Sequence, residues 1–152
     1  LFFQVEQIGL HIRSFFMLFR RDKVTSVTYS KSSDAQQGSN AVLMVGSTKN
    51  ARFGSSDITL AAGTYSLSVY AKSVAGTAKF KMGYAIIDMI DTDAMNAYKY
   101  TQTDAEILST EWRQITHEFT VENETVASIF FVNSKSGVGA DLLIDNVSLT
   151  KK

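Results

Sequence analysis

The chain of 152 residues contains no cysteine and no proline. Without cysteine it can form no disulfide, no thiolate zinc site and no cysteine nucleophile. Without proline, its turns depend on Gly, Asn, Asp and Ser. The missing cysteine does not fix the compartment, because a domain of this size buries a sufficient core without covalent cross-links.

The chain also lacks an excess of either charge, since 15 basic and 15 acidic residues give a net charge of zero. It therefore has no global field that would draw it to nucleic acid or to an anionic membrane, and the overall balance favours a neutral partner. No apolar stretch approaches the roughly 20 residues of a membrane span, so we expect no membrane insertion. Residues 1–19 are rich in apolar side chains, but Glu6 and Arg13 interrupt them. Basic residues follow this segment instead of preceding it, and we therefore expect no signal peptide.

What the chain does contain, from residue 24 onward, is a succession of short stretches in which polar and apolar residues alternate. This period of two predicts β-strands, and turn residues recur roughly every ten positions. The clearest strand covers residues 64–72, with Tyr70 on its polar face. A second strand covers residues 78–86, with Tyr84 on its apolar face. We expect these two strands to pair as a hairpin, with Tyr70 beside Lys81.

Further strands are predicted at 24–29, 41–45, 58–60, 98–100, 112–121, 126–133 and 142–149, with an acidic, partly helical segment at 88–96. Such a pattern is typical of an all-β, two-sheet antiparallel β-sandwich, either a jelly roll or an immunoglobulin-like fold. We expect a single domain over residues 1–152, in which residues 1–23 form an atypical N-terminal segment.

Four segments favour the jelly roll: 38–45, 58–72, 111–121 and 142–149. They contain a small-residue turn before an apolar strand, a Gly-Thr-Tyr-x-Leu-Ser strand, a strand that begins with Trp112, and a final Ile-Asp-Asn-Val strand. Their order and spacing resemble the carbohydrate-binding modules of families 4, 9 and 22, over about residues 25–150. The resemblance implies non-catalytic binding of a polysaccharide or oligosaccharide by an accessory module of a secreted or cell-surface bacterial protein. It also implies a linked glycoside hydrolase domain as a partner.

The same resemblance implies one cofactor, a structural calcium ion. Relatives hold it between an opening Asn-Gly-x-Phe-Glu segment and the Asp of the last strand, which is Asp145 here. Residues 1–23 contain no such opening segment. Asp145 is therefore the single metal-ligand candidate.

Sugar binding requires aromatic rings that stack on pyranose faces and polar groups that reach the hydroxyls. Three candidates also have a structural interpretation: Tyr84 as a core residue, Tyr70 as an ordinary cross-strand aromatic, and Gln114 as part of a solvated face. Tyr98 and Tyr100 follow an irregular loop, where binding residues often gather. The predicted ligand-binding residues are Tyr70, Tyr84, Tyr98, Tyr100, Lys81 and Gln114.

No pattern supports catalysis, because the chain has no nucleophile elbow, phosphate loop, zinc-protease helix or dinucleotide fingerprint. We therefore expect no enzyme activity. Asp88, Asp91 and Asp93 lack the Gly and distal Glu of a calcium loop and favour a solvated loop. His117 is expected to be partly buried and hydrogen-bonded. Two other functions remain open: a structural or protein-interaction sandwich domain of a larger surface protein, and a small hydrolase with two facing carboxylates.

Overall fold

The computed structural model describes residues 2–7, 10–15, 29–46, 48, 50–103, 105–134 and 140–152, the first two ranges by their backbone alone. Two short helical elements, η1 (Ile87–Met89) and α1 (Ala94–Ala97), lie among the strands. The strands are β1 (Phe2–Gln7), β2 (Leu10–Phe15), β3 (Tyr29–Ser32), β4 (Ala41–Met44), β5 (Ala51–Gly54), β6 (Ile58–Leu60), β7 (Gly63–Ser73), β8 (Ala78–Ile86), β9 (Tyr98–Tyr100), β10 (Glu106–Leu108), β11 (Arg113–Val121), β12 (Thr125–Asn133) and β13 (Leu142–Lys151).

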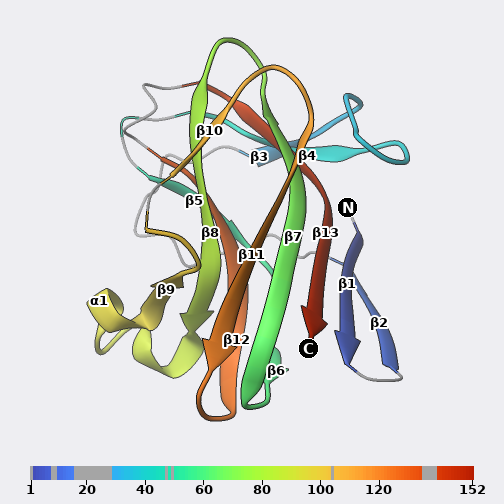
Figure 1. Cartoon of the computed structure of the whole chain (residues 1–152). Coiled ribbons are helices and arrows are strands. Elements are labelled where there is room, and N and C mark those ends of the chain that lie inside the picture. The colour runs from blue at the N-terminus through green and yellow to red at the C-terminus, as the bar shows by residue number, and fades with distance from the viewer. Residues whose placement is uncertain are drawn as a thin grey trace.

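The strands form two sheets that face each other (Figure 1). The seven-stranded sheet has the order β11-β7-β13-β1-β2, with β4 beside β13 and β3 beside β4. The six-stranded sheet has the order β10-β8-β12-β5, with β9 also on β8 and β6 also on β12. All pairs are antiparallel except β1 with β13. The predicted jelly-roll β-sandwich is confirmed.

The core lies between the sheets and follows from the alternation in the sequence. Along β7 every second side chain is buried, and along β8 the same holds from Ala78 to Met82. Phe80 of β8 and Phe131 of β12 stack with their ring centroids 6.1 Å apart, and both are fully buried. Burial of apolar area contributes about 25 cal/mol per Å², so this two-layer interior is the main source of stability.

The predicted hairpin of residues 64–72 and 78–86 is wrong. The two strands exist as β7 and β8, but β7 pairs with β11 and β13 in one sheet, whereas β8 pairs with β12, β9 and β10 in the other. Residues 74–77 therefore carry the chain from sheet to sheet. Alternation determines which face of a strand is buried, but it does not determine which strand is its neighbour.

The last strand changes its neighbour part-way along. Residues 142–144 of β13 pair with β4, and residues 147–150 pair with β1. Between them the register against β7 shifts from Asp145 to Ser148, and Asn146 has a φ of 48°. Asn tolerates this left-handed conformation better than most residues, and such a bulge bends a strand. The Asp-Asn pair in the sequence thus marks the place where β13 turns from one partner to the next.

Most of the other elements predicted from the sequence are present in the structure. Strands at 41–45, 58–60, 98–100, 112–121, 126–133 and 142–149 and the helical turn near 88–96 are confirmed within one or two residues at most ends. β5 and β10 were not predicted from the sequence. The strand predicted at 24–29 lies outside the described residues except for Tyr29, which begins β3. The extent of the domain over residues 1–152 stays a prediction.

We expect the fold to lose stability at alkaline pH, because two tyrosine side chains face the interior. Burial raises the pKa of Tyr65 and of Tyr84 above the ordinary value of 10.0. Above pH 10.0 the unfolded chain therefore releases protons that the folded chain keeps, which favours unfolding. We expect the urea midpoint to hold steady up to about pH 9 and to fall as the pH rises beyond the ordinary tyrosine pKa. A midpoint that stays level through this range, or an equal fall in a variant with Phe at both positions, would contradict this explanation.

Candidate functional site

The outer face of the six-stranded sheet carries a cluster of aromatic and cationic side chains, which we call the β9 face. At its centre is Phe130 of β12, whose neighbours across the sheet are Gly54 of β5 and Gly83 of β8. Beyond Gly83 lies Tyr100 of β9. The two glycines contribute no side chains, so the aromatic rings of neighbouring strands can reach over them.

Two tyrosines of β9 pack against Phe130. The rings of Tyr98 and Tyr100 each meet it edge-on, with centroids 5.3 Å from the Phe130 centroid. Edge-to-face packing of this kind stabilises an aromatic pair beyond the area that it buries. Phe130 is only 3% exposed, whereas Tyr100 is 39% exposed. Tyr100 is thus an aromatic ring on this face that a ligand can reach, and Phe130 supports it from below.

Two cationic side chains approach the tyrosines from the strands on either side of β12. The Arg52 guanidinium of β5 lies 4.7 Å from the Tyr98 ring centroid, and its Nη2 donates to the Tyr100 hydroxyl over 3.4 Å. The Lys81 ammonium of β8 lies 5.3 Å from the Tyr100 centroid and donates to the Thr103 carbonyl over 2.6 Å. The tyrosines and Lys81 were predicted from the sequence. Arg52 was missed because β5 was not recognised as a strand.

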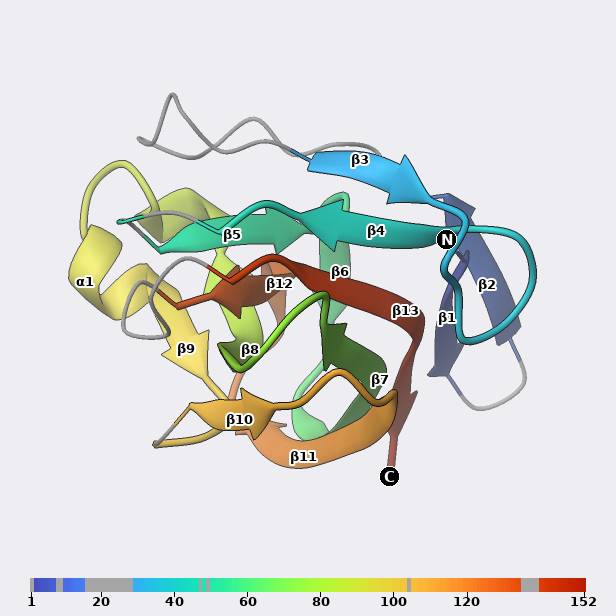
Figure 2. The ribbon, with the colours of Figure 1, turned by 90° about the horizontal axis from the view of Figure 1, so that it is seen from above.

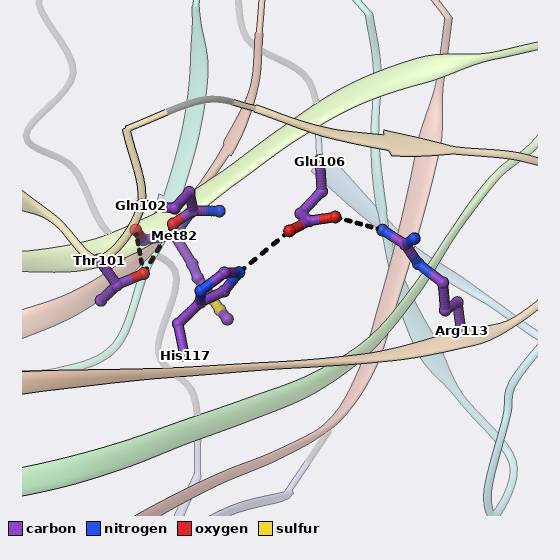
Figure 3. Close-up of polar contacts among 6 residues, drawn as sticks. All are labelled: Met82, Thr101, Gln102, Glu106, Arg113 and His117. Atoms are coloured by element: carbon purple, nitrogen blue, oxygen red, sulfur yellow. Dashed lines mark hydrogen bonds and ion pairs between the residues drawn. The ribbon is translucent and has the colours of Figure 1, made fainter.

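The side chains after β9 hold that strand against β8 (Figure 3). The Thr101 backbone N–H donates to the Met82 carbonyl over 3.0 Å, and the Thr101 hydroxyl donates to the same oxygen. The Gln102 side-chain oxygen accepts from the Met82 N–H at 3.4 Å. The Gln102 side chain thereby accepts the hydrogen bond that a backbone carbonyl of a neighbouring strand would otherwise accept from Met82. These contacts fix the end of β9 next to Tyr100.

A polar tie joins the two sheets at the edge where β10 of one lies next to β11 of the other (Figures 2 and 3). Glu106 of β10 accepts from the Arg113 guanidinium over 2.6 Å and contacts His117 Nε2 at 3.1 Å. The expectation of a partly buried, hydrogen-bonded His117 is confirmed. Because the members are partly exposed, the tie aligns the sheet edges more than it stabilises them.

Tyr84, predicted as a ligand-binding residue, is instead part of the core. Its side chain points between the sheets, where its ring stacks on Phe119 with centroids 4.8 Å apart. The residue is 9% exposed. Its position in the strand has the parity of Phe80 and Met82, so the sequence itself supports the structural interpretation.

Tyr70 and Gln114 lie together, but on the opposite side of the molecule from Tyr100. They are cross-strand neighbours on the outer face of the seven-stranded sheet, between β7 and β11. Lys81 belongs to the other sheet, so the predicted contact between Tyr70 and Lys81 is wrong. Nearby, the Lys72 ammonium lies 5.2 Å from the Trp112 ring centroid and pairs with Asp34 at 2.5 Å.

Asp145 anchors a loop on that same face. Its Oδ2 accepts from the backbone N–H groups of Gln36 and Gln37, each over 3.0 Å, and its Oδ1 accepts from the Asn146 N–H over 2.8 Å. Calcium takes six to eight oxygen ligands, and in the described part of the chain no three acidic or histidine side chains gather to hold a metal. These surroundings do not by themselves fit a calcium ion. The calcium at Asp145 stays a prediction.

Removing this carboxylate is expected to destabilise the fold without affecting the β9 face. Asp145 is 3% exposed, and Asp145→Ala removes the acceptor of three part-buried hydrogen bonds from backbone N–H groups. We expect a loss of about 1.5 kcal/mol in the free energy of unfolding. Urea denaturation at 25 °C measures it. An Asp145→Asn variant, which keeps one acceptor oxygen, should lose less; an unchanged midpoint in both variants would contradict the anchoring role.

The family model described as "Carbohydrate binding domain" matches residues 18–140. The chain belongs to this family. No curated protein matches it. Within the part of the chain that the structure describes, no helix is long and apolar enough to cross a membrane.

Solved structures of carbohydrate-binding modules share the fold of this family member. A xylan-binding domain of a Paenibacillus barcinonensis protein is 18% identical, with a TM-score of 0.59 and coverage of 83% of this chain and 81% of that one. A Clostridium thermocellum xylanase fragment complexed with xylohexaose is 17% identical, with a TM-score of 0.63, and covers 85% of this chain and 25% of that one. A module complexed with β-1,4-galactotriose is 18% identical, with a TM-score of 0.53 and coverage of 86% and 85%. At these identities the likeness establishes the fold.

Proposed function

We propose that the β9 face is the surface on which this carbohydrate-binding domain holds a polysaccharide chain. The observation that carries this proposal is Tyr100, an aromatic ring that is 39% exposed, supported from below by Phe130 and bordered by Arg52 and Lys81. An exposed ring stacks on a pyranose face, and adjacent donors bind the hydroxyls. Tyr98 supports the site through its contacts with Phe130 and Arg52.

The outer face of the seven-stranded sheet is less suited to this role. Near Tyr70, residues 36 and 37 bind the Asp145 side chain and cover the neighbouring part of β13. Leu143 on that strand is only 2% exposed. A binding surface for an extended glycan needs an uninterrupted row of accessible side chains, and the loop at 36–37 interrupts this one.

The family assignment does not favour a structural or protein-interaction sandwich domain. We further propose that the chain carries out no bond chemistry and serves as an accessory module of a secreted or cell-surface bacterial protein. Such a module keeps a linked glycoside hydrolase close to its polysaccharide. The xylanase fragment complexed with xylohexaose, in which such a module is joined to a GH10 module, supports this arrangement.

Affinity electrophoresis tests the proposed binding. The chain is run through gels that contain xylan, glucuronoxylan, β-glucan or β-1,4-galactan, with gels free of polysaccharide as the reference. We expect retardation by at least one of them, and its loss in a Tyr100→Ala variant. Equal mobility in every gel, or retardation that Tyr100→Ala leaves unchanged, would count against the β9 face.

A further inference from the structure

The chain itself covers much of the outer face of the six-stranded sheet. Strand β12 lies between β5 and β8, and its side chains alternate between the core and this outer face. The outward residues Ser128, Phe130 and Val132 are only 6%, 3% and 2% exposed. A glycan laid across the sheet from β5 to β8 would therefore meet no accessible side chain at these three positions.

The segment that connects β8 to β9 provides part of this cover (Figures 1 and 2). Residues of η1, α1 and their flanks pack onto outward residues of β8 and β12 and form a second apolar cluster with them, apart from the core between the sheets. The buried members of this cluster are Ala85, Ile90, Ala97, Phe130 and Val132. Tyr98 packs against the cluster and is partly buried. This part of the β9 face is therefore filled by side chains of the chain itself.

Tyr100 is the aromatic ring that this cover leaves accessible. In the described part of the chain, the exposed large apolar side chains are Val74, Met95, Tyr100, Ile107 and Val126, and Tyr100 is the aromatic one among them. Polar groups border its ring, since the Arg52 guanidinium donates to its hydroxyl and the Lys81 ammonium lies 5.3 Å from its centroid. One phenol ring offers a stacking surface for one pyranose ring.

The exposed apolar side chains nearest to Tyr100 in the sequence do not offer a second stacking surface. Ile107 of β10 lies roughly 13 Å from Tyr100, counted along β8 between their register partners. Between them the Lys81 ammonium donates to the Thr103 carbonyl over 2.6 Å. Met95 belongs to α1, which precedes β9. Because neither Ile107 nor Met95 is aromatic, a sugar ring can stack on Tyr100 but not on these neighbours.

We propose that the β9 face binds one sugar residue at a time and recognises residues that a polysaccharide presents singly, at chain ends and branch points. An extended glycan needs a row of contacts. On the seven-stranded sheet the loop at 36–37 interrupts such a row, and on the β9 face the buried positions of β12 do. A terminal or branching residue reaches Tyr100 without its neighbours having to cross β12. This inference rests on the proposed function and adds the size of the glycan unit that is recognised.

A series of oligosaccharides of increasing length tests the proposal by isothermal titration. Fragments of two, three, four and six backbone residues are prepared from xylan, glucuronoxylan, β-glucan and β-1,4-galactan. We expect at least one series to bind, with an affinity that changes by less than about threefold from two residues to six, because residues beyond the first add no contact. A larger and steady rise with length would overturn the proposal. Linear fragments present single residues at their ends, whereas glucuronoxylan fragments also present branches, so the two sources are distinguished.

Variants on either side of Tyr100 give an independent measurement. Met95 and Ile107 are 89% and 64% exposed, so Met95→Ala and Ile107→Ala should fold normally, which a urea midpoint checks. Both should bind the six-residue fragment as the unaltered chain does. Tyr100→Ala should lower the affinity for the two- and six-residue fragments by the same factor. A loss in Met95→Ala or Ile107→Ala that is confined to the six-residue fragment would show that a longer chain contacts these side chains, and would overturn the proposal.

Failure of this inference and failure of the proposed function give different results. Retardation by a polysaccharide that Tyr100→Ala abolishes, without binding of any of its fragments, would contradict the single-residue site and leave the β9 face as a glycan surface. Failure of all four polysaccharides and all their fragments to bind would contradict both this inference and, for these polymers, the proposed function itself.

Discussion

Replacing Gly83 with alanine is expected to lower the free energy of unfolding by about 3 kcal/mol and to abolish glycan retardation. A Cβ at Gly83 would overlap the Lys99 carbonyl oxygen and come within 2.9 Å of the Tyr100 Cα. Both are backbone atoms, so no side-chain rotation relieves the overlap and β9 has to move away from β8. Tyr98 and Tyr100 would move with it. Urea denaturation measures the first effect, and affinity electrophoresis measures the second.

Gly76→Ala is a control for this experiment. Gly76 has a φ of +67°, and a Cβ there would meet no atom within 4 Å. The substitution should therefore cost about 1 kcal/mol through backbone strain and leave glycan affinity unchanged. If Gly83→Ala instead behaves like Gly76→Ala and keeps its affinity, the close approach of β8 and β9 does not position the site.

Truncating Tyr100 to alanine is expected to lower glycan affinity about 30-fold, which corresponds to about 2 kcal/mol. The ring supplies the stacking surface, and its loss also removes the contacts that hold Arg52 and Lys81 beside it. Because the side chain is 39% exposed, the fold should lose little stability. Isothermal titration with glucuronoxylan and a urea midpoint together distinguish lost binding from lost folding.

Two further variants show which part of Tyr100 and which face of the molecule are responsible for the loss of affinity. Tyr100→Phe keeps the ring and loses only the hydroxyl that accepts from Arg52, so it should retain most of the affinity. Tyr70→Ala changes a tyrosine on the opposite face and should bind normally. A large loss in Tyr70→Ala together with normal binding by Tyr100→Ala would place the site on the seven-stranded sheet instead.

The two-layer fold could be predicted from the sequence because burial is recorded in the alternation of side chains. The face of residues 64–72 that contains Tyr65 and Leu67 is buried as expected, and the same holds for Phe80 and Met82. Strand pairing was predicted wrongly at the same place. Which strands pair in a sandwich depends on contacts between segments far apart in the chain. A short stretch of sequence does not show these contacts.

The candidate site could be predicted only in part for the same reason. Tyr98 and Tyr100 follow an irregular segment, which is a local signal, and both lie on the β9 face. Lys81 was identified through a pairing with Tyr70 that does not exist. Arg52 comes from a four-residue strand some 46 positions before Tyr98, and only the register of β5, β12 and β8 brings them together.

The local charge of the site was hidden for a related reason. The composition balances at zero, and on that basis alone a neutral partner was favoured. The pairing of the strands nevertheless brings two cationic side chains, Arg52 and Lys81, next to Tyr100 on one face. Net charge describes the whole molecule, whereas recognition depends on one face.

Backbone amide chemical shifts, followed by NMR while a glucuronoxylan oligosaccharide is added, test the location of the site most directly. If the site lies on the β9 face, we expect the largest shifts on residues of β5, β8 and β9 around Arg52, Lys81 and Tyr100. The amides of Tyr70 and Gln114 should change little. Shifts concentrated on β7 and β11, with those of β9 unmoved, would contradict it.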